Sequence, residues 1–249
     1  MDQHPRAAQI SAAVVARLET GGDVQDVEGV LAVMRDLDGL LPDEDGLKWF
    51  NLLYRMVTES IHAQLPAGEW ADARWLTQLD VLFARRYFDA LLAWHQDPRS
   101  SPRAWRALFA ARYRPGIRRV QFALAGMNAH INHDLPLAVV ETCVATMLEP
   151  ERGSLQFQDF ERVNQILEEV EPRALQHLAT GILGLVAEEL GVLRHVLSMW
   201  SVRHARDTAW TNGSVLWDIR DAPRLRNRVV LALDRMTGFA GRGLLLPVV

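Results

Sequence analysis

Residues 118–136 read RRVQFALAGMNAHINHDLP, and this stretch decides what fold we expect. On a helical wheel of about 100° per residue, one apolar stripe is formed by Val120, Leu124, Met127 and Ile131. The opposite side carries mostly small residues, which let neighbouring helices approach closely. A helix that is apolar nearly all round belongs in the interior of a protein. We therefore expect a buried central helix over residues 116–134.

Helical periodicity also dominates the rest of the chain, and alternating strand patterns are almost absent. The sequence predicts an all-α, single-domain bundle of about ten helices that spans residues 1–249. Punctuation by Pro, Gly, Ser and Asp places the expected helices at about 6–18, 24–37, 44–64, 72–96, 103–113, 116–134, 136–148, 159–170, 173–211 with a break near 181–184, and 222–237. The apolar tail GRGLLLPVV is expected to dock against the domain.

Composition narrows the function classes. The 249 residues are 49% hydrophobic, enough for a large core, and the formal net charge is −4. The basic residues are scattered, which argues against a nucleic-acid partner and against a polybasic membrane patch. The single cysteine, Cys143, lies in an apolar run and should pack as a small hydrophobe. With neither a secretory signal nor a membrane span in the sequence, we expect a soluble cytoplasmic protein.

Asp80 is a carboxylate in an apolar position. In WLTQLDVLFARRYFDALLAW it falls near the middle of the stripe that contains Leu76, Leu79, Phe83 and Tyr87. An ionised carboxylate without a partner is costly in a protein core. Asp80 must therefore meet a cation, a metal ion or hydrogen-bond donors, or else stay protonated.

Three further segments turn polar side chains inward. His130 and Asp134 lie four residues apart on one edge of the central stripe, and Asn128 lies on the other edge. Asn164 interrupts the stripe of the expected helix 159–170, and His204, bordered by Arg203, continues the stripe of 173–211. Because single buried polar groups are expensive, we expect these side chains to share one network or wet cavity.

The pair His130 and Asp134 fits two chemical uses, chelation of one metal ion or an oriented acid–base pair. A purely structural alternative is that Asp134 caps a helix beginning at Pro136 and that His130 is a satisfied core histidine. His133 points away from His130 on the wheel and is expected at the surface or between helices. Arg203 and Arg206 fit a clamp for a carboxylate or phosphate, or ion pairs with nearby acids.

Other known motifs give little support for a particular kind of active site. Glu59-Ser-Ile-His62 has the Glu-x-x-His form of di-iron bundles, but a second copy is missing and the two residues lie opposite the apolar stripe. The sequence also lacks a Gly-rich phosphate loop, a Gly-x-Ser-x-Gly elbow and a Cys-x-x-Cys pair. Nucleotide binding and serine hydrolase chemistry by the usual routes are therefore disfavoured.

The segments FNLLYRMVTESI, LDVLFARRYFDALLAW, GMNAHINHDLPLAV, DFERVN and RHARDTAW carry a resemblance to a known family. Over residues 45–215 the chain resembles a bacterial all-helical family, common in actinobacteria and of unknown function, that is marked by Asn-Ala-His-Ile-Asn-x-Asp-Leu. More distantly, FALAGMNAHINHDLPLA is similar to the His-x-x-x-Asp helix of zinc-dependent phospholipase C. That similarity implies that His130 and Asp134 are metal ligands, although the other ligand motifs of that family are not matched.

Together these observations predict a small-molecule enzyme with metal-assisted or acid–base chemistry, such as a hydrolase, lyase, isomerase or cyclase of secondary metabolism. The expected catalytic residues are His130, Asp134 and Asp80, and His130 and Asp134 would bind a divalent metal such as zinc or iron if there is one. The expected substrate contacts are Asn128, Asn132, Asn164, Arg203, Tyr87 and His204. The alternatives are a non-catalytic small-molecule binding protein and a structural polar network without a site.

Overall fold

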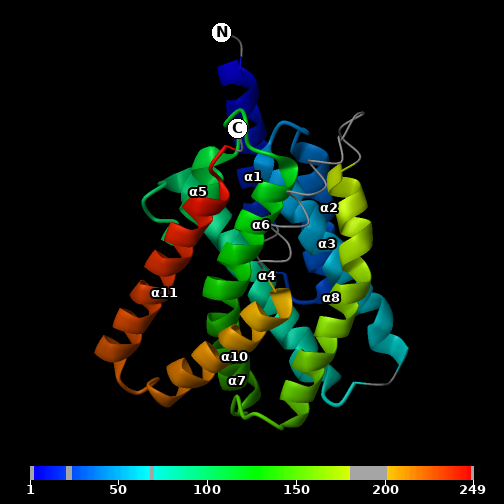
Figure 1. Ribbon diagram of the computed structural model, residues 1–249, viewed down its shortest axis with the longest axis vertical. Helices are drawn as coiled ribbons and strands as arrows, with labels where there is room; N and C mark the ends of the chain where they lie inside the picture. Colours follow the sequence, from blue (N-terminus) through cyan, green and yellow to red (C-terminus); the bar gives the residue numbers. More distant parts are fainter. Residues whose placement is uncertain (1–2, 21–23, 68–69, 180–200, 248–249) are drawn as a thin grey trace.

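The computed structural model describes residues 3–20, 24–67, 70–179 and 201–247, which form a bundle of helices without a strand (Figure 1). The predicted all-α class is confirmed. The α-helices are α1 (Gln3–Thr20), α2 (Val27–Leu40), α3 (Gly46–Gln64), α4 (Ala73–Gln96), α5 (Arg103–Ala111), α6 (Arg119–Ala129), α7 (Leu135–Thr146), α8 (Leu155–Ala179), α10 (Val202–Asp218) and α11 (Pro223–Leu244). A 3-10 turn, η1 (Leu65–Ala67), follows α3, and a π-helical turn, η2 (His130–Asp134), joins α6 to α7.

The start of α3 is tied to the end of α5 by a buried ion pair. The Asp45 side chain caps α3 by accepting from the Leu47 amide at 3.0 Å. It also accepts from Nε of Arg112 at 2.8 Å and from the Tyr113 hydroxyl at 2.7 Å. Asp45 and Arg112 are both buried. Buried charges of this kind are tolerated only when hydrogen bonds satisfy them, so this cluster fixes α5 against α3.

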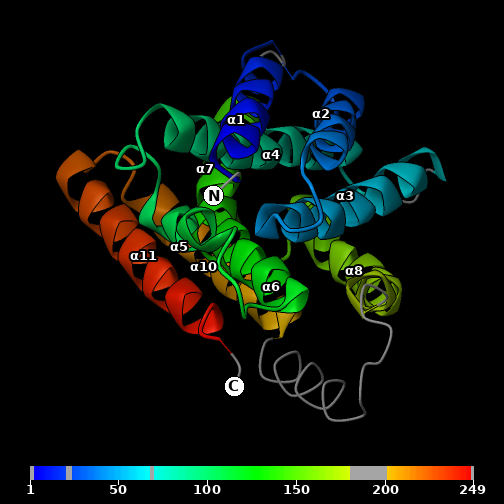
Figure 2. The same cartoon turned by 90° about the horizontal axis from the view of Figure 1, so that it is seen from above.

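The central helix predicted from residues 118–136 is confirmed. Most residues of α6 are buried, and the helix contacts α3, α5, α8 and α11 (Figure 2). Two glycines allow the close crossing of α6 with α3. The ring of Phe50 on α3 lies against Gly126, and the ring of Phe122 on α6 lies against Gly46, so that a Cβ atom at either glycine would overlap a ring. This contact sets Phe50 beside the ring of His130, with 5.7 Å between centroids.

The predicted break between helices 116–134 and 136–148 is wrong. Asp134 has helical backbone angles, φ −80° and ψ −39°, and its side chain makes no capping hydrogen bond. The chain instead continues through η2, where the Leu135 amide donates to the carbonyl of His130, five residues earlier. Pro136 follows directly. Because proline lacks an N–H and crowds the carbonyl four residues before it, a widened turn ahead of Pro136 keeps the helix continuous.

Other helix boundaries also differ from those predicted from the sequence. Helix α8 is longer than the expected 159–170 and contains Pro172, and the part of the expected helix 173–211 that covers 180–200 lies outside the described residues. Helix α10 begins afresh at Val202, where the Ser201 hydroxyl accepts from the His204 amide at 3.2 Å. The tail docks as predicted through Leu245, which is buried, while Gln121 donates to the carbonyls of Leu244 and Leu246.

Two expectations from composition hold. Cys143 is buried, and burial raises the pKa of its thiol to about 11, so it behaves as a small hydrophobe. Among the helices that the structure describes, none has the length and apolar character to cross a membrane.

Replacing Gly126 by Ala should destabilise the fold, because the new methyl group meets the buried ring of Phe50. Overpacking of this kind costs about 1–3 kcal/mol in the free energy of unfolding. The matched control is Gly39→Ala on the exposed side of α2, where a Cβ meets nothing within 4 Å and a helical alanine should be neutral or stabilising by about 0.5–1 kcal/mol. Urea titration of both variants measures the difference, and equal stabilities would contradict the close crossing.

Candidate functional site

The carboxylate of Asp134 is the centre of the buried polar group and accepts three hydrogen bonds. The indole Nε1 of Trp105 donates to Oδ2 at 2.8 Å, Nδ1 of His130 lies 3.0 Å from the same oxygen, and Nδ1 of His133 lies 2.7 Å from Oδ1. Asp134 is only 1% exposed. Burial opposes its charge, but the hydrogen bonds from the two imidazoles outweigh burial and hold the pKa of Asp134 well below its usual range.

This arrangement fixes the tautomer of His130. An ionised carboxylate can only accept, so the Nδ1 atom that faces Asp134 must carry the proton. Burial is the main cause that lowers the pKa of His130, so the ring is neutral near pH 7 and its Nε2 holds a free lone pair. Nε2 is buried and has no hydrogen-bond partner in the described part of the chain. His130 therefore offers a proton acceptor to whatever lies beside Nε2.

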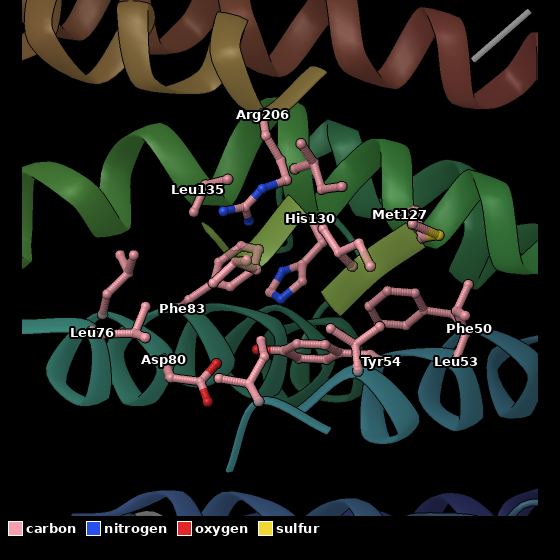
Figure 3. Close-up of a pocket in the computed structure, with 16 residues that line it drawn as sticks. Phe50, Leu53, Tyr54, Leu76, Asp80, Phe83, Met127, His130, Leu135 and Arg206 are labelled. Carbon is pink, nitrogen blue, oxygen red and sulfur yellow. The ribbon is translucent and has the colours of Figure 1, made fainter. Parts of the chain in front are cut away.

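Aromatic rings hold His130 in place. The Phe83 ring of α4 stacks on the imidazole with 3.5 Å between centroids and 6° between planes, and the Tyr54 ring of α3 packs edge-on at 4.5 Å (Figure 3). Together with the bond to Asp134, these contacts leave the imidazole one orientation.

The imidazole borders a cavity of about 70 Å³ that is lined by residues of α3, α4, α6, η2, α7, α8 and α10 (Figure 3). Most of the lining is apolar, and its ionisable members besides Tyr54 are Asp80, His130 and Arg206. Lining residues that are only half-buried mark the side where the cavity approaches the surface; these are Leu53, Val57, Met127 and Leu167. The site is therefore a small, mainly apolar cavity with three ionisable groups besides Tyr54, and the half-buried part of its lining includes the flexible Met127.

Asp80 is buried as the sequence predicts. Its Oδ2 atom lacks a hydrogen-bond partner among the residues described. Burial raises the pKa of Asp80 to about 7, and the charge of Arg206 limits that rise. Near neutral pH a large fraction of Asp80 is therefore protonated and can donate a proton.

Arg206 supplies a buried cation. Its Nε donates to Oδ1 of Asn164 at 2.8 Å, another guanidinium nitrogen donates to the carbonyl of Phe160 at 2.7 Å, and the guanidinium lies 4.1 Å from the centroid of the Phe160 ring. Burial lowers the pKa of Arg206 to about 10, which leaves it charged at neutral pH. The α8 residues thus hold this side chain at the cavity wall.

The structure separates the predicted site residues into two groups. His130 and Asp80 line the cavity, Asp134 is joined to it through its hydrogen bond to His130, and Asn164 is joined to it by orienting Arg206. Tyr87 does not line the cavity. It is fully buried in the core, where its ring stacks on Trp105 and its hydroxyl lies 3.4 Å from Asn51.

The inward direction predicted for His204 and Arg203 is wrong. Both side chains are exposed, and Arg203 lies 3.7 Å from Glu168 and 3.9 Å from Glu161 at the surface. The prediction carried one helical phase from residues 193–200 into 204. Because α10 has its own start at Ser201, that phase does not apply, and Arg206 occupies the inward position.

Asn128 and Asn132 lie in a contact between the central helix and α11, away from the cavity. The Asn128 side chain is buried and donates to the carbonyl of Thr237 on α11 at 3.0 Å, and Asn132 donates to the Asn128 side-chain oxygen at 3.1 Å. Neither residue lines the cavity. These amides join the central helix to α11 and are placed to hold the helices together.

The structure also locates His133 and the Glu-x-x-His motif. His133 is buried between helices: it bonds to Asp134, and its Nε2 lies 3.9 Å from Asp234 of α11. The π turn brings it to the same carboxylate as His130, which an ideal helical wheel does not anticipate. Glu59 of the Glu-x-x-His motif pairs with Arg35 and Arg55, so this motif belongs to an interhelical ion-pair network.

The donor set does not fit the predicted metal chelate. Both oxygens of Asp134 and the Nδ1 atom of His130 are occupied by the hydrogen bonds within the cluster. Across the described residues, no three His, Cys, Asp or Glu side chains gather closely enough to hold a metal ion. His130 and Asp134 instead form a carboxylate–imidazole pair in which Asp134 orients the ring, and the use of this pair in acid–base chemistry stays a prediction.

The aromatic residues around the site are not among the site residues predicted from the sequence. Trp105 donates to Asp134, and Phe83 and Tyr54 hold the imidazole. Phe83 was assigned only to the apolar stripe. Only a general argument points to Trp105 in the sequence. A buried indole N–H needs an acceptor, and a buried Asp134 carboxylate needs donors.

The fold and the site define an all-helical bundle with an interior cavity that carries an oriented histidine. The chain belongs to the family described as "Family of unknown function (DUF5995)", whose model matches residues 27–247. The match extends beyond the expected 45–215 at both ends. No curated protein and no solved structure gives a significant match to the chain.

Replacing Asp80 by Asn should change how stability depends on pH. In the folded protein Asp80 keeps its proton up to about pH 7, whereas in the unfolded chain it ionises near its ordinary value of 3.8. The stability that comes from this protonated form is full below about pH 4 and is lost as the pH rises through about 7. The free energy of unfolding of Asp80→Asn should therefore gain on that of the wild type between pH 4 and pH 8, by up to about 4 kcal/mol. Denaturant titrations at several pH values measure this, and parallel curves would show that Asp80 ionises normally in the fold.

Proposed function

We propose that the chain is an acid–base enzyme that moves protons on a small, mainly apolar molecule bound in the interior cavity. The observation that carries this proposal is the Nε2 atom of His130, which is buried and unpartnered within the described residues while Asp134 fixes the other ring nitrogen. Packing alone does not explain why a core histidine beside a cavity keeps a ring nitrogen without a hydrogen-bond partner among the described residues. Of the reaction classes predicted from the sequence, those that need only proton transfer, isomerases, lyases and cyclases, fit best.

In this proposal His130 is the proton acceptor and Asp134 is a positioning residue. The carboxylate keeps the Nδ1–H tautomer and stabilises the imidazolium that forms when Nε2 takes a proton from the bound molecule. The stack with Phe83 limits rotation of the ring. Asp134 itself remains ionised throughout, because its hydrogen bonds hold the pKa low.

Asp80 is the proposed proton donor, and Arg206 stabilises negative charge on an oxygen of the bound molecule. In an isomerisation, His130 removes one proton from carbon and Asp80 returns one at a second position. The transfers leave an imidazolium and a carboxylate, and a proton passed through water between them restores both groups. The raised pKa of Asp80 supports this role, since a carboxylic acid must hold its proton near neutral pH to give it up.

The cavity indicates the class of substrate. A volume of about 70 Å³ accommodates a few water molecules or a compact molecule, and a larger one must displace lining side chains such as Met127. The apolar lining favours a hydrocarbon skeleton, and the three ionisable groups favour one carbonyl or carboxylate oxygen on it.

A second candidate is a non-catalytic binding protein for the same kind of molecule. The mainly apolar lining supports it, because apolar walls with a few polar groups also describe simple ligand pockets. In that case His130 and Arg206 would accept or donate hydrogen bonds without moving protons.

Deuterium exchange tests the proposal without knowledge of the natural substrate. The full chain is incubated in D2O with a panel of small cyclic ketones and short unsaturated carboxylic acids, and NMR follows deuterium incorporation at carbon. The wild type should accelerate exchange on at least one compound, and His130→Gln should lower that rate about 10²- to 10⁴-fold. The rate should fall above about pH 7, where Asp80 loses its proton, and again at low pH, where His130 gains one. The control is His204→Gln, which changes an exposed histidine and should leave exchange intact.

The outcomes separate the three classes. Binding without exchange, with an affinity that His130→Gln lowers, would establish the binding protein and refute the enzyme. Absence of both binding and exchange, with lower melting temperatures for His130→Gln and Asp134→Asn, would leave the cluster as a structural network.

A further inference from the structure

Helix α11 carries a concentration of positive charge that the chain as a whole does not have. It contains five arginines and one acidic residue, Asp234, while the chain has a net charge of −4. Asp234 is buried and accepts from the Ala104 amide at 2.9 Å, so it does not neutralise the outer face. The outward surface of α11 is therefore basic on an acidic protein.

The arginines form a line along α11. Arg228, Arg235 and Arg242 recur every seventh residue, which places them on one edge of the helix, and Arg224 precedes them by one turn. All four are exposed. In the described part of the chain none of them lies within ion-pair distance of a carboxylate. These arginines do not form a consecutive run in the sequence, which is why the sequence predicts no polybasic patch; helical spacing brings them together.

An exposed apolar stripe runs beside the arginines. Leu225, Ala232 and Phe239 share the same spacing of seven, and Met236 lies between Ala232 and Phe239 on this face. Phe239 is 74% exposed and Met236 is 70% exposed. At the end of the helix Leu246 continues the apolar surface.

The packing of α11 fixes this face outward. Gly238 lies against the backbone of α5, where a Cβ would come within 2.6 Å of the Arg103 carbonyl oxygen, and Asp234 and Thr237 are buried on the same side. The helix lies at the outer edge of the bundle in both views (Figures 1 and 2). The arginines and the apolar stripe of α11 thus form a ridge on the surface of the molecule.

We propose that α11 docks the protein on an anionic lipid surface. A basic edge beside exposed Phe, Met and Leu is the pattern of helices that lie in the membrane interface, where apolar side chains enter the acyl boundary and arginines meet anionic headgroups. A nucleic acid would be contacted through charges at the centre of the face, where α11 has its apolar residues. The alternative of a second protein chain is decided by the experiment below.

The test is flotation of the full chain with vesicles of phosphatidylcholine alone or of equal parts phosphatidylcholine and phosphatidylglycerol. The chain should float with the anionic vesicles only, and binding should fall with added salt. Arg228→Glu with Arg235→Glu should weaken binding at least about tenfold, given roughly fivefold for each arginine near such a surface. Met236→Ser with Phe239→Ser should weaken it by a similar factor through lost insertion.

Matched controls change equally exposed residues elsewhere. Arg74→Glu with Arg99→Glu removes charge from other surfaces, and Val144→Ser with Leu155→Ser removes apolar side chains. Both pairs should bind as the wild type does, and circular dichroism melting confirms that every variant is folded. The proposal is overturned by equal flotation with neutral and anionic vesicles, by no flotation, or by insensitivity to the α11 variants. Self-association of the wild type that Met236→Ser with Phe239→Ser abolishes, in the absence of vesicle binding, would instead identify the ridge as an interface between copies.

Discussion

The three hydrogen bonds that converge on the Asp134 carboxylate are the constraint on which the site depends. They come from Trp105 on α5 and from two imidazoles of the π turn, so one buried charge both ties α5 to the π turn and orders the turn itself. Removing any one donor would leave part of a buried charge unsatisfied, which is costly in a core. The same bonds determine which nitrogen of His130 carries the proton and which keeps a lone pair, so a stabilising contact also sets the chemistry of the ring.

Two aspartates in one interior show how environment assigns opposite roles to the same side chain. Asp134 meets three donors and keeps its charge despite burial, whereas burial dominates at Asp80 and raises its pKa to about 7. Arg206 combines both effects: burial lowers its pKa to about 10, and its hydrogen bonds to Asn164 and to the Phe160 carbonyl hold the charged side chain in place. A carboxylate that stays ionised, an imidazole with a free lone pair and a carboxyl group that keeps its proton are the parts that proton transfer requires.

Sequence periodicity was sufficient for what depends on a single regular helix. It predicted the all-α class, the buried central helix and the burial of Asp80, because apolar spacing within one helix reports directly on its buried face. It failed where regular geometry is interrupted. The π turn at His130–Asp134 brings His133 to Asp134, and the new start of α10 replaces His204 by Arg206 at the interior. Contacts between distant helices, such as Trp105 with Asp134, leave no periodic signal in one sequence.

The tautomer of His130 is the most direct measure of the account, because every proposed role of the cavity follows from it. Nitrogen-15 NMR of the histidine rings at pH 7 distinguishes a protonated from an unprotonated ring nitrogen in the full chain. We predict a neutral His130 with the proton on Nδ1 and a bare Nε2, and we predict that Asp134→Asn weakens or reverses this preference. A proton on Nε2 in the wild type, or a doubly protonated ring, would contradict the account.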